Sequence, residues 1–441
     1  MKIAEAHVTA DFKETPYWWE AAPLVKLAPV PVPARVDVAI VGGGLTGLNA
    51  ARILARAGRS VAVFEAGDPG EGASSRNAGY VARTLKHSFL DLERQHGLDY
   101  AVTTYKEMQA AFDSVRDVIR DERIDCQFRI DGRYMPTASP AHYESMAREL
   151  EARRRHLGSE FEMVPRRAQH RELATDLYHG GAVMPDLGGL HPGLYYRGLL
   201  DRARKAGATV VANTRVTGID REPKGGGFTL ATARGATQAR EVIVATNGYT
   251  GRATPWLARR VVPFNGYMVA TEPLPAELIG RVLPKDRTCI DSNHDPNFVR
   301  RSPDGERLLF GGLTGRRTDG LWPMAARLQA LLERTLPDLK GVKLSHAWTG
   351  LCAGTFDFWP HVGARDGLHF AMGYNFAGVP MGTYLGQKVA LKILGSPEAR
   401  TVFDRPFPTV PLYTGNPWFV PQVMRVFNWL DRWDARRGPS K

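Results

Sequence analysis

The sequence predicts an α/β protein in which a Rossmann-type nucleotide-binding domain is interleaved with a mostly antiparallel β-sheet domain, an α+β insert. Three observations support this prediction. A glycine-rich turn joins a short apolar strand to a helix within residues 36–67. A buried strand with a polar end occupies 241–250, and a second glycine-rich loop precedes a helix within 369–395. Helical and strand-rich segments separate these three regions, so the nucleotide-binding domain is built from distant parts of the chain.

The same pattern predicts the domain boundaries. Three adjacent aromatic residues, Tyr17, Trp18 and Trp19, predict that the N-terminal arm packs against the body of the protein. The predicted parts are an arm at 1–33, the nucleotide-binding domain at 34–90, 190–255 and 345–400, a second domain at 91–189 and 256–344, and a C-terminal tail at 401–441.

The first glycine-rich turn has the spacing G-x-G-x-x-G at Gly42, Gly44 and Gly47. The first glycine permits a tight turn, the second lets a phosphate approach the backbone, and the third lets the helix pack closely on the strand. Leu45 and Thr46 begin a helix that we expect to end near residue 57. Its free N–H groups and positive dipole predict a pyrophosphate site.

A second strand at 60–64 ends at Glu65, which Ala66 follows. A carboxylate at this position accepts hydrogen bonds from ribose hydroxyls and repels a 2′-phosphate, so NADP is disfavoured. A glycine-rich turn without a ligand is the alternative, but the ordered strand, helix, second strand and acid argue against it. These residues alone leave open whether the nucleotide carries a nicotinamide or a flavin.

Composition restricts the other classes of function. The three cysteines, Cys126, Cys289 and Cys352, are too few and too scattered for a disulfide framework or a zinc site, which indicates a reducing compartment and no metal. No apolar run reaches the roughly 18 residues of a membrane span, and no secretory signal is evident, so we expect a cytoplasmic protein. The net charge of +12 is spread widely, without a basic run or a nucleic-acid-binding motif, so no nucleic-acid partner is expected.

Two further regions favour a flavin. The loop "GASSRNAGY" at 72–80 is small and polar, and such a loop can follow a pyrophosphate and ribityl chain toward a ring. The strand "EVIVATNGYT" ends in residues 246–248, which suit closure over the nucleotide. A late loop then leads into a helix expected at 381–394, whose dipole would stabilise negative charge on a reduced flavin.

Together these motifs resemble the D-amino-acid-oxidase-like superfamily of FAD oxidoreductases, over most of residues 34–400. The early loop is similar to the G-A-S-x-R-N-x-G loop of gamma-glutamylputrescine oxidase-like proteins. The segments "WTGLCAGTFDFWPHVG" and "GYNFAGVPMG" are similar to the C-terminal motifs of that group. The resemblance implies FAD, and the expected FAD-binding residues are Gly42, Gly44, Leu45, Thr46, Gly47, Glu65, Ala66, Ser74, Ser75, Arg76, Asn77, Gly79, Val216, Thr246, Asn247, Gly248, Gly350, Gly373, Asn375, Gly378, Val379, Pro380 and Met381.

The resemblance also predicts how the flavin is attached. Relatives with covalent flavin use a histidine in the early loop or a cysteine in the late one. This chain has Ser75 and Arg76 in the early loop, and the cysteine position aligns with Gly350, two residues before Cys352. We therefore expect noncovalent FAD, with Cys352 as a buried apolar residue.

The resemblance implies oxidation of a carbon–nitrogen bond in an amine or amino acid, by hydride transfer to flavin N5 and hydrolysis of the imine. The second domain is then the substrate domain. Arg300 and Arg301 alternate across a strand, so one of them, with Arg300 as the candidate, would face inward and hold a substrate carboxylate bidentately. Two solvated arginines beside a turn are the alternative. Trp348, Phe356 and Tyr374 are expected to form an apolar or cation-binding wall around the amine. Tyr267, on a probable strand, is a further candidate contact, although each of these residue types is also common in a core.

Several alternatives stay open at this point. Related flavoproteins oxidise 2-hydroxy acids, the charge of +12 keeps a flavoprotein acting on modified tRNA in view, and a nonenzymatic FAD-binding module is a further alternative. The electron acceptor is also left open, and it is either oxygen, as in an oxidase, or another compound, as in a dehydrogenase. Sarcosine oxidases place a lysine over the flavin where this chain has Leu309, which favours a dehydrogenase.

Overall fold

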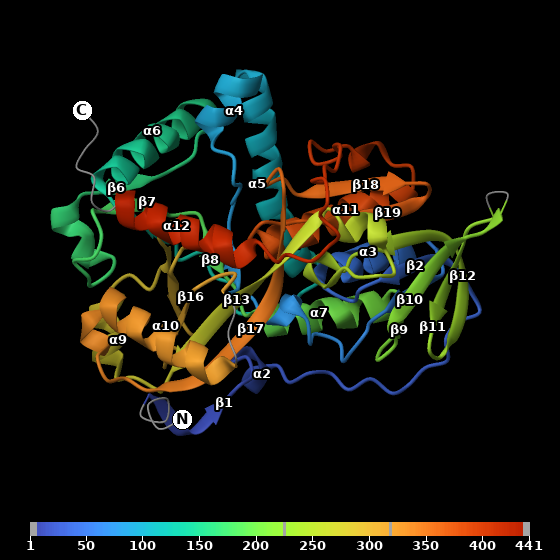
Figure 1. Ribbon diagram of the computed structural model, residues 1–441, viewed down its shortest axis with the longest axis horizontal. Helices are drawn as coiled ribbons and strands as arrows, with labels where there is room; N and C mark the ends of the chain where they lie inside the picture. The colour runs from blue at the N-terminus through green and yellow to red at the C-terminus, as the bar shows by residue number, and fades with distance from the viewer. Residues whose placement is uncertain (1–6, 224–225, 317–319, 435–441) are drawn as a thin grey trace.

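A parallel β-sheet forms the nucleotide-binding part of the computed structural model, which describes residues 7–223, 226–316 and 320–434 (Figure 1). The strand order is β9-β3-β2-β12-β19, and every neighbouring pair is parallel. Their short apolar runs are largely buried, as expected of strands covered on both faces. The strands are β2 (Arg35–Val41), β3 (Val61–Phe64), β9 (Thr209–Val211), β12 (Gly235–Val244) and β19 (Leu368–Met372).

Antiparallel strands extend this sheet to eight strands. The first half of β12 pairs with β11 (Phe228–Thr232), which pairs with β10 (Val216–Arg221). On the other part of the sheet, β18 (His361–Arg365) pairs with β19. A separate two-stranded ribbon joins β4 (Tyr80–Val81) to β8 (Gly188–Gly189).

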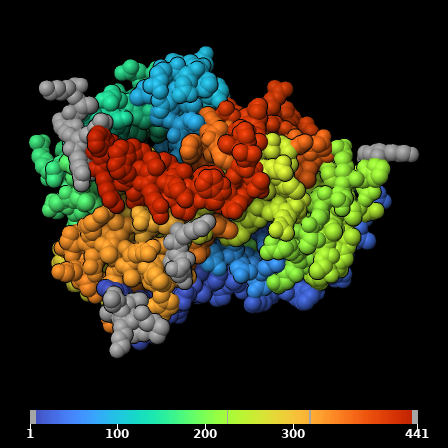
Figure 2. All heavy atoms as spheres, viewed as in Figure 1, coloured from blue at the N-terminus to red at the C-terminus, as the bar shows by residue number. Residues whose placement is uncertain are grey.

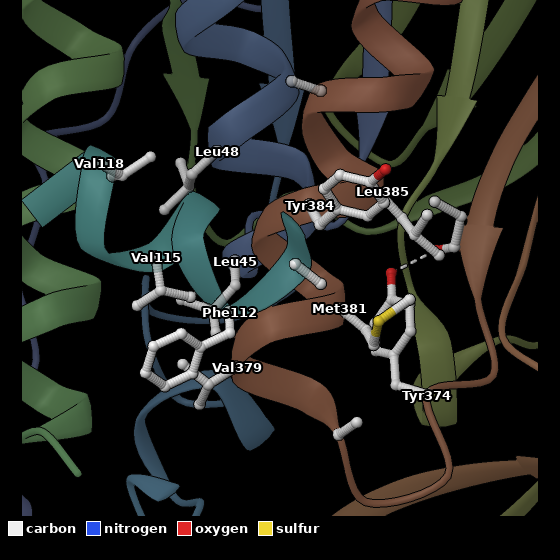
Figure 3. Packing of buried hydrophobic residues seen from close by; sticks show 14 of the residues in the cluster. Leu45, Leu48, Phe112, Val115, Val118, Tyr374, Val379, Met381, Tyr384 and Leu385 are labelled. Carbon is white, nitrogen blue, oxygen red and sulfur yellow. Dashed lines mark hydrogen bonds between the residues drawn. The ribbon is translucent and has the colours of Figure 1, made fainter. Parts of the chain in front are cut away.

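Four helices share a hydrophobic core with one face of the parallel sheet, and two peripheral helices add Phe89, Leu92 and Leu150 to that core. Leu45 and Leu48 of the first glycine-rich helix meet Met381 and Leu385 of the late helix in this core (Figure 3). The late helix begins at Gly378, three residues earlier than expected, so Pro380 lies in its first turn. The helices are α3 (Leu45–Arg56), α5 (Leu98–Asp121), α7 (Pro192–Lys205) and α11 (Gly378–Ile393).

The second sheet has nine strands in the order β1-β17-β13-β16-β15-β14-β5-β7-β6. Only the pairs β1–β17 and β14–β5 along this order are parallel, so the prediction of a mostly antiparallel sheet is confirmed. The strands are β1 (Val8–Lys13), β5 (Arg133–Pro136), β6 (Glu162–Val164), β7 (Gly181–Met184), β13 (Val261–Thr271), β14 (Thr288–Ile290), β15 (Phe298–Arg301), β16 (Leu308–Gly312) and β17 (Leu344–Thr355).

The two sides of this sheet are covered by different parts of the chain. α9 (Ala276–Val282) and α10 (Leu321–Thr335) contribute to the core on one side. On the other side Trp18, in α2 (Trp18–Ala21), is fully buried against Leu309 and Trp348. The aromatic arm therefore packs on the body, as expected. β1 and β17 both belong to this sheet, whereas the sequence assigns 1–33 to an arm and 345–400 to the nucleotide-binding domain; that division stays a prediction.

The remaining helices lie at the periphery. The segment 91–157 contains α5 and a second long helix, α6, with strand β5 between them. The C-terminal helix α12 runs across the face shown in Figures 1 and 2. None of the helices in the described ranges is long and apolar enough to cross a membrane. These helices are α4 (Phe89–His96), α6 (Pro140–Leu157), α8 (Pro255–Ala258) and α12 (Val420–Asp434), with short 3-10 turns η1 (Ala73–Ser75), η2 (Arg166–Arg171), η4 (Asn247–Tyr249), η5 (Pro337–Leu339) and η6 (Pro397–Ala399).

Candidate cofactor site

The first glycine-rich turn closes too tightly for side chains. Gly42 has a φ of +105°, a conformation that favours glycine. A Cβ atom on Gly47 would lie 2.0 Å from the carbonyl oxygen of Gly42, and one on Gly44 would lie 2.8 Å from Ser74 Oγ. Gly44 precedes the first residue of α3 and provides no side-chain cap. The turn therefore brings the N-terminus of α3 close to the end of β2, as a pyrophosphate site requires.

Glu65 follows β3 and lies beside this turn. Its Oε2 accepts a hydrogen bond from the Gly43 N–H at 2.9 Å, and its Oε1 accepts one from the Gly67 N–H at 3.3 Å. Burial raises the pKa of the Glu65 carboxyl above its usual value. Ala66 continues the loop, and the Tyr196 hydroxyl in α7 donates to the Gly43 carbonyl at 2.8 Å. The sequence did not identify Tyr196, because a tyrosine in an apolar helix face has no local signal for this contact.

The early loop is attached to the start of α3. Ser74 Oγ accepts a hydrogen bond from the Leu45 N–H at 3.1 Å. The Asn77 side chain holds the loop in shape, because its Nδ2 donates to the Ser74 carbonyl at 2.9 Å and its Oδ1 accepts from the Gly79 N–H at 2.8 Å. The loop thus lies directly beside the predicted pyrophosphate site.

Arg76 connects this loop to the second sheet and to the N-terminal arm. Its Nη1 donates to the Thr349 carbonyl of β17 at 3.0 Å, and its guanidinium lies 4.6 Å from the ring centre of Trp19. Trp19 Nε1 also donates to Ser75 Oγ at 2.8 Å. A Cβ on Gly350 would lie 3.3 Å from Arg76 Cβ, so β17 passes close to the loop. The early loop is therefore held between both sheets.

The loop after β12, at 245–250, meets the late loop before α11, at 373–377, at the end of the parallel sheet. Asn247 Oδ1 accepts a hydrogen bond from the Gly373 N–H at 2.9 Å. Asn375 has a φ of 46° and its Nδ2 donates to the Gly373 carbonyl at 2.8 Å. A Cβ on Gly248 would lie 2.6 Å from the Cys352 carbonyl oxygen, so this glycine also permits a close approach. Three segments that are distant in sequence thus come together here.

Other predicted FAD-binding residues lie at the starts of α3 and α11, in the loop after β12 and at the start of β10. Thr46 Oγ1 lies 2.6 Å from the Tyr374 hydroxyl, and a Cβ on Gly382 of α11 would lie 3.3 Å from Thr46 Oγ1. The first turns of α3 and α11 are therefore neighbours. Thr246 Oγ1 lies 2.7 Å from Thr250 Oγ1. Val379, Pro380 and Met381 are buried in the first turn of α11, and Val216 is buried where β10 begins.

This donor set suits FAD. Two helix N-termini favour negative charge, the glycine-rich turn leaves the backbone accessible to a phosphate, and Glu65 offers a carboxylate to ribose hydroxyls. The residues present therefore fit the cofactor that the motifs predict.

The predicted substrate residues do not form one group, and Phe356 packs against Tyr413 with ring centres 5.0 Å apart. Arg300 is the inward arginine, and its Nη1 donates to the carbonyls of Ala78 and Leu190 at 3.0 and 2.9 Å. The Tyr267 hydroxyl donates to the Arg316 carbonyl at 2.7 Å. The structure distributes the three aromatic residues over separate clusters: Tyr267 faces α10, Trp348 packs near the arm and donates from Nε1 to the Arg76 carbonyl, and Tyr374 lies in the core at α3. Their roles toward substrate stay predictions.

Leu309 and Cys352 differ in their exposure to solvent. Leu309 is fully buried beside Trp18 and Trp348. Cys352 is partly exposed, which differs from the expectation of a buried residue. Desolvation nevertheless raises the pKa of the Cys352 thiol to about 11, so it is neutral near pH 7.

Lys86 is a residue that sequence reasoning missed. Its side chain is exposed, yet the surrounding protein desolvates the ammonium and lowers its pKa. Lys86 Nζ lies 4.9 Å from the ring centre of Phe376, which is 42% exposed and packs on Phe264 at 5.1 Å. Among the described residues Lys86 forms no ion pair, so this cation remains available beside the late loop. No motif surrounds it in the sequence.

Comparisons with known proteins identify relatives of similar length. The chain matches the DAO family of FAD-dependent oxidoreductases over residues 37–391. It is 31% identical over 380 residues to a gamma-glutamylputrescine oxidoreductase of Escherichia coli (strain K12), which covers 84% of this chain and 88% of that protein. It is also 31% identical to a probable oxidoreductase OrdL of Rhizobium meliloti (strain 1021), over 86% of this chain and 88% of that protein.

Solved structures share the fold. The crystal structure of a glycine oxidase from Geobacillus kaustophilus matches with a TM-score of 0.70 and 23% identity, over 86% of this chain and 99% of that one. The L-proline dehydrogenase from P. horikoshii matches with a TM-score of 0.69 and 16% identity, over 89% and 99%.

Proposed function

The chain belongs to the DAO family of FAD-dependent oxidoreductases, and from this premise we propose that it oxidises a carbon–nitrogen bond in an amine or amino acid. The family match confirms the predictions of an enzyme and of FAD as its cofactor. The names of its relatives support the substrate class, since gamma-glutamylputrescine and glycine both carry amine groups. The observation that carries the proposal is the tight glycine-rich turn at Gly42, Gly44 and Gly47, in a chain that is similar to such an enzyme over 84% of its length.

The residues of this chain divide the work of holding FAD. The turn at Gly42, Gly44 and Gly47 would hold the pyrophosphate, and Glu65 would accept hydrogen bonds from ribose hydroxyls. The early loop around Arg76 would hold the part of the cofactor between the pyrophosphate and the ring. The dipole at the N-terminus of α11 would stabilise negative charge on the flavin. Bound FAD supplies the hydride acceptor, so no side-chain base is required for that step.

We propose that Lys86 contacts an anionic group of the substrate. Arg300, the predicted carboxylate partner, is fully engaged at Nη1 by backbone carbonyls, whereas Lys86 combines exposure with a desolvated ammonium. A carboxylate placed there gains more than it would in water, because the surrounding protein lowers the effective dielectric constant. The aromatic ring of Phe376, whose centre lies 4.9 Å from Lys86 Nζ, stabilises the cation through a cation–π interaction.

A matched pair of variants tests this contact. Lys86→Met should raise KM for a carboxylate-bearing substrate at least tenfold while FAD content stays at one per chain. Lys285→Met removes an exposed lysine elsewhere and should leave KM unchanged. Equal KM values in all three proteins would remove Lys86 from the substrate site.

Anaerobic bleaching of the bound flavin tests the function itself. The holoenzyme is mixed with a panel of amines, amino acids and 2-hydroxy acids, and absorbance of oxidised flavin is followed. We expect bleaching by an amine or amino acid and none by its hydroxy analogue. Bleaching by 2-hydroxy acids alone would assign that chemistry instead, and salt-sensitive retention of tRNA without bleaching would favour a nucleic-acid substrate.

We also propose a cytoplasmic location. All three cysteines are free, as expected in a reducing compartment. Detection of the protein in a periplasmic or culture-medium fraction would contradict this proposal.

A further inference from the structure

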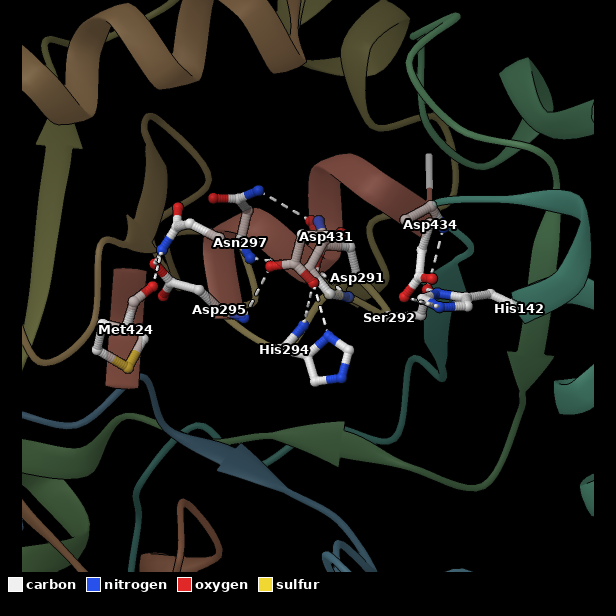
Figure 4. A network of polar contacts seen from close by, with 12 residues as sticks. His142, Asp291, Ser292, His294, Asp295, Asn297, Met424, Asp431 and Asp434 are labelled. Carbon is white, nitrogen blue, oxygen red and sulfur yellow. Dashed lines mark hydrogen bonds and ion pairs between the residues drawn. The ribbon is translucent and has the colours of Figure 1, made fainter. Parts of the chain in front are cut away.

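The C-terminal helix α12 attaches to the protein through polar contacts. Asp431 Oδ1 accepts hydrogen bonds from the backbone N–H and Nδ1 of His294, both at 2.8 Å (Figure 4). Asn428 Nδ2 donates to Asp295 Oδ2 at 3.3 Å, and Met424 is the one buried side chain within the helix. The side of α12 that faces the body therefore combines polar contacts with apolar ones, since Phe427 lies with its ring centre 5.5 Å from that of His294 and Met424 packs near Gly315.

The opposite side of α12 is apolar and exposed. Val426 is 53% exposed and Trp429 is 58% exposed, and Trp433 stacks on Trp429 with ring centres 5.6 Å apart. Trp418, just before the helix, is 63% exposed. Seven of the thirteen exposed large apolar side chains in the described residues lie between 410 and 433, namely Val410, Leu412, Trp418, Val423, Val426, Trp429 and Trp433. This clustering distinguishes the segment from the singly scattered apolar residues of an ordinary surface.

Charges on α12 are sorted in the same way. The acidic residues turn inward, because Asp431 binds His294 and Asp434 lies 3.5 Å from His142 Nε2. Arg425 and Arg432 are exposed. The outward face of α12, defined by Val423, Val426, Trp429 and Trp433 with Arg425 and Arg432, thus combines apolar side chains with positive charge only. In Figure 2 the C-terminal segment, in red, lies openly on the face in view.

We propose that the outward face of α12 docks onto the surface of a membrane that contains anionic lipids. Tryptophan prefers the boundary between headgroups and acyl chains, and an amphipathic helix with valine, tryptophan and arginine on its outer side lies in that boundary. The helix would lie on the membrane rather than cross it, consistent with the absence of a spanning helix in the described ranges.

Charge favours a lipid surface over a second copy of this chain. Each copy carries a net charge of +12, and a symmetric contact through α12 would bring Arg425 and Arg432 of both copies together. An anionic membrane instead attracts both arginines. This inference goes beyond the proposed function and does not depend on it.

Vesicle sedimentation with the full-length holoenzyme tests the proposal. We expect sedimentation with vesicles of phosphatidylglycerol and phosphatidylcholine, and none with phosphatidylcholine alone. High salt should weaken the binding, and Arg425→Gln and Arg432→Gln should each weaken it about fivefold. Binding that ignores lipid charge would overturn the proposal.

Matched variants test whether vesicle binding requires the outward face of α12 or only exposed apolar side chains anywhere on the protein. Trp418→Ser/Trp429→Ser should abolish sedimentation while FAD content and thermal stability stay unchanged. Leu98→Ser/Leu177→Ser removes two apolar side chains exposed elsewhere, at 37% and 39%, and should bind vesicles like the parent. Equal vesicle binding by both double variants would overturn the proposal. The proposal would also be overturned if the parent protein formed a dimer in light scattering and bound no vesicles, and if the tryptophan double variant were a monomer. Flavin bleaching, measured separately, reports on the proposed function alone.

Discussion

Replacement of Glu65 by Gln measures what one carboxylate contributes to FAD binding. Glu65 Oε2 lies 2.9 Å from the Gly43 nitrogen and Oε1 lies 3.3 Å from the Gly67 nitrogen, so both oxygens face N–H donors. Glutamine keeps one oxygen and places an NH2 group against the other N–H. The variant therefore loses a charge-assisted acceptor for ribose and also weakens the loop that positions it.

The size of the effect follows from the type of bond. A hydrogen bond to a charged group contributes about 1.5–3 kcal/mol, which corresponds to roughly a ten- to hundredfold increase in Kd for FAD. Burial raises the pKa of Glu65 in the protein, so its charge destabilises the fold as pH rises above the ordinary value of a glutamate. Glutamine removes that cost, and the apoprotein should therefore be as stable as the parent or more stable near pH 7.

Titration of the apoprotein with FAD, followed by quenching of flavin fluorescence, gives Kd directly. Glu71→Gln provides the matched control, because Glu71 is exposed and close to the same loop. An unchanged Kd in Glu65→Gln would show that the carboxylate does not contact the cofactor. An equal loss in both variants would attribute the effect to local charge rather than to a hydrogen bond.

Four further predictions follow from the same geometry. Gly47→Ala should lose most bound FAD, since its Cβ would lie 2.0 Å from the Gly42 carbonyl oxygen, whereas Gly280→Ala in open space should retain it; flavin content per chain distinguishes them. Acid precipitation should release the flavin into solution, and colour in the pellet would contradict noncovalent binding. The resemblance aligns Leu309 with the lysine that assists oxygen in sarcosine oxidases; on that alignment, stopped-flow reoxidation by oxygen should be slower than by a quinone-like dye, and equal rates would refute this. Burial lowers the pKa of His191 to about 4, so the free energy of unfolding should fall as pH decreases from 6.5 toward 4. His191→Asn should remove up to about 3 kcal/mol of that fall, measured by thermal unfolding as a function of pH. An unchanged pH profile would exclude His191 as its source.

Local patterns in the sequence were sufficient to predict the nucleotide-binding turn. Gly42, Gly44 and Gly47 are required by steric contacts within a few residues, and the helix they begin ends at Arg56, close to the expected residue 57. The alternation of nucleotide-binding and inserted segments also predicted the two sheets, because strand and helix periods are readable along the chain. Family motifs then predicted FAD, which the family match confirms.

Tertiary structure decided which side chains meet. Tyr267 and Trp348 lie on opposite faces of the antiparallel sheet, because successive residues in a strand point to opposite sides and the pairing register selects the side. The same applies to α12, whose Asp431 turns inward onto His294, 137 positions earlier in the chain. Lys86 lies beside the ring of Phe376, almost 300 residues later in the chain, and burial by the surrounding protein lowers its pKa. The sequence by itself determined the local elements and the cofactor; contacts between distant segments determined the exposed faces and the surroundings of each candidate residue, since burial depends on neighbours that no local pattern specifies.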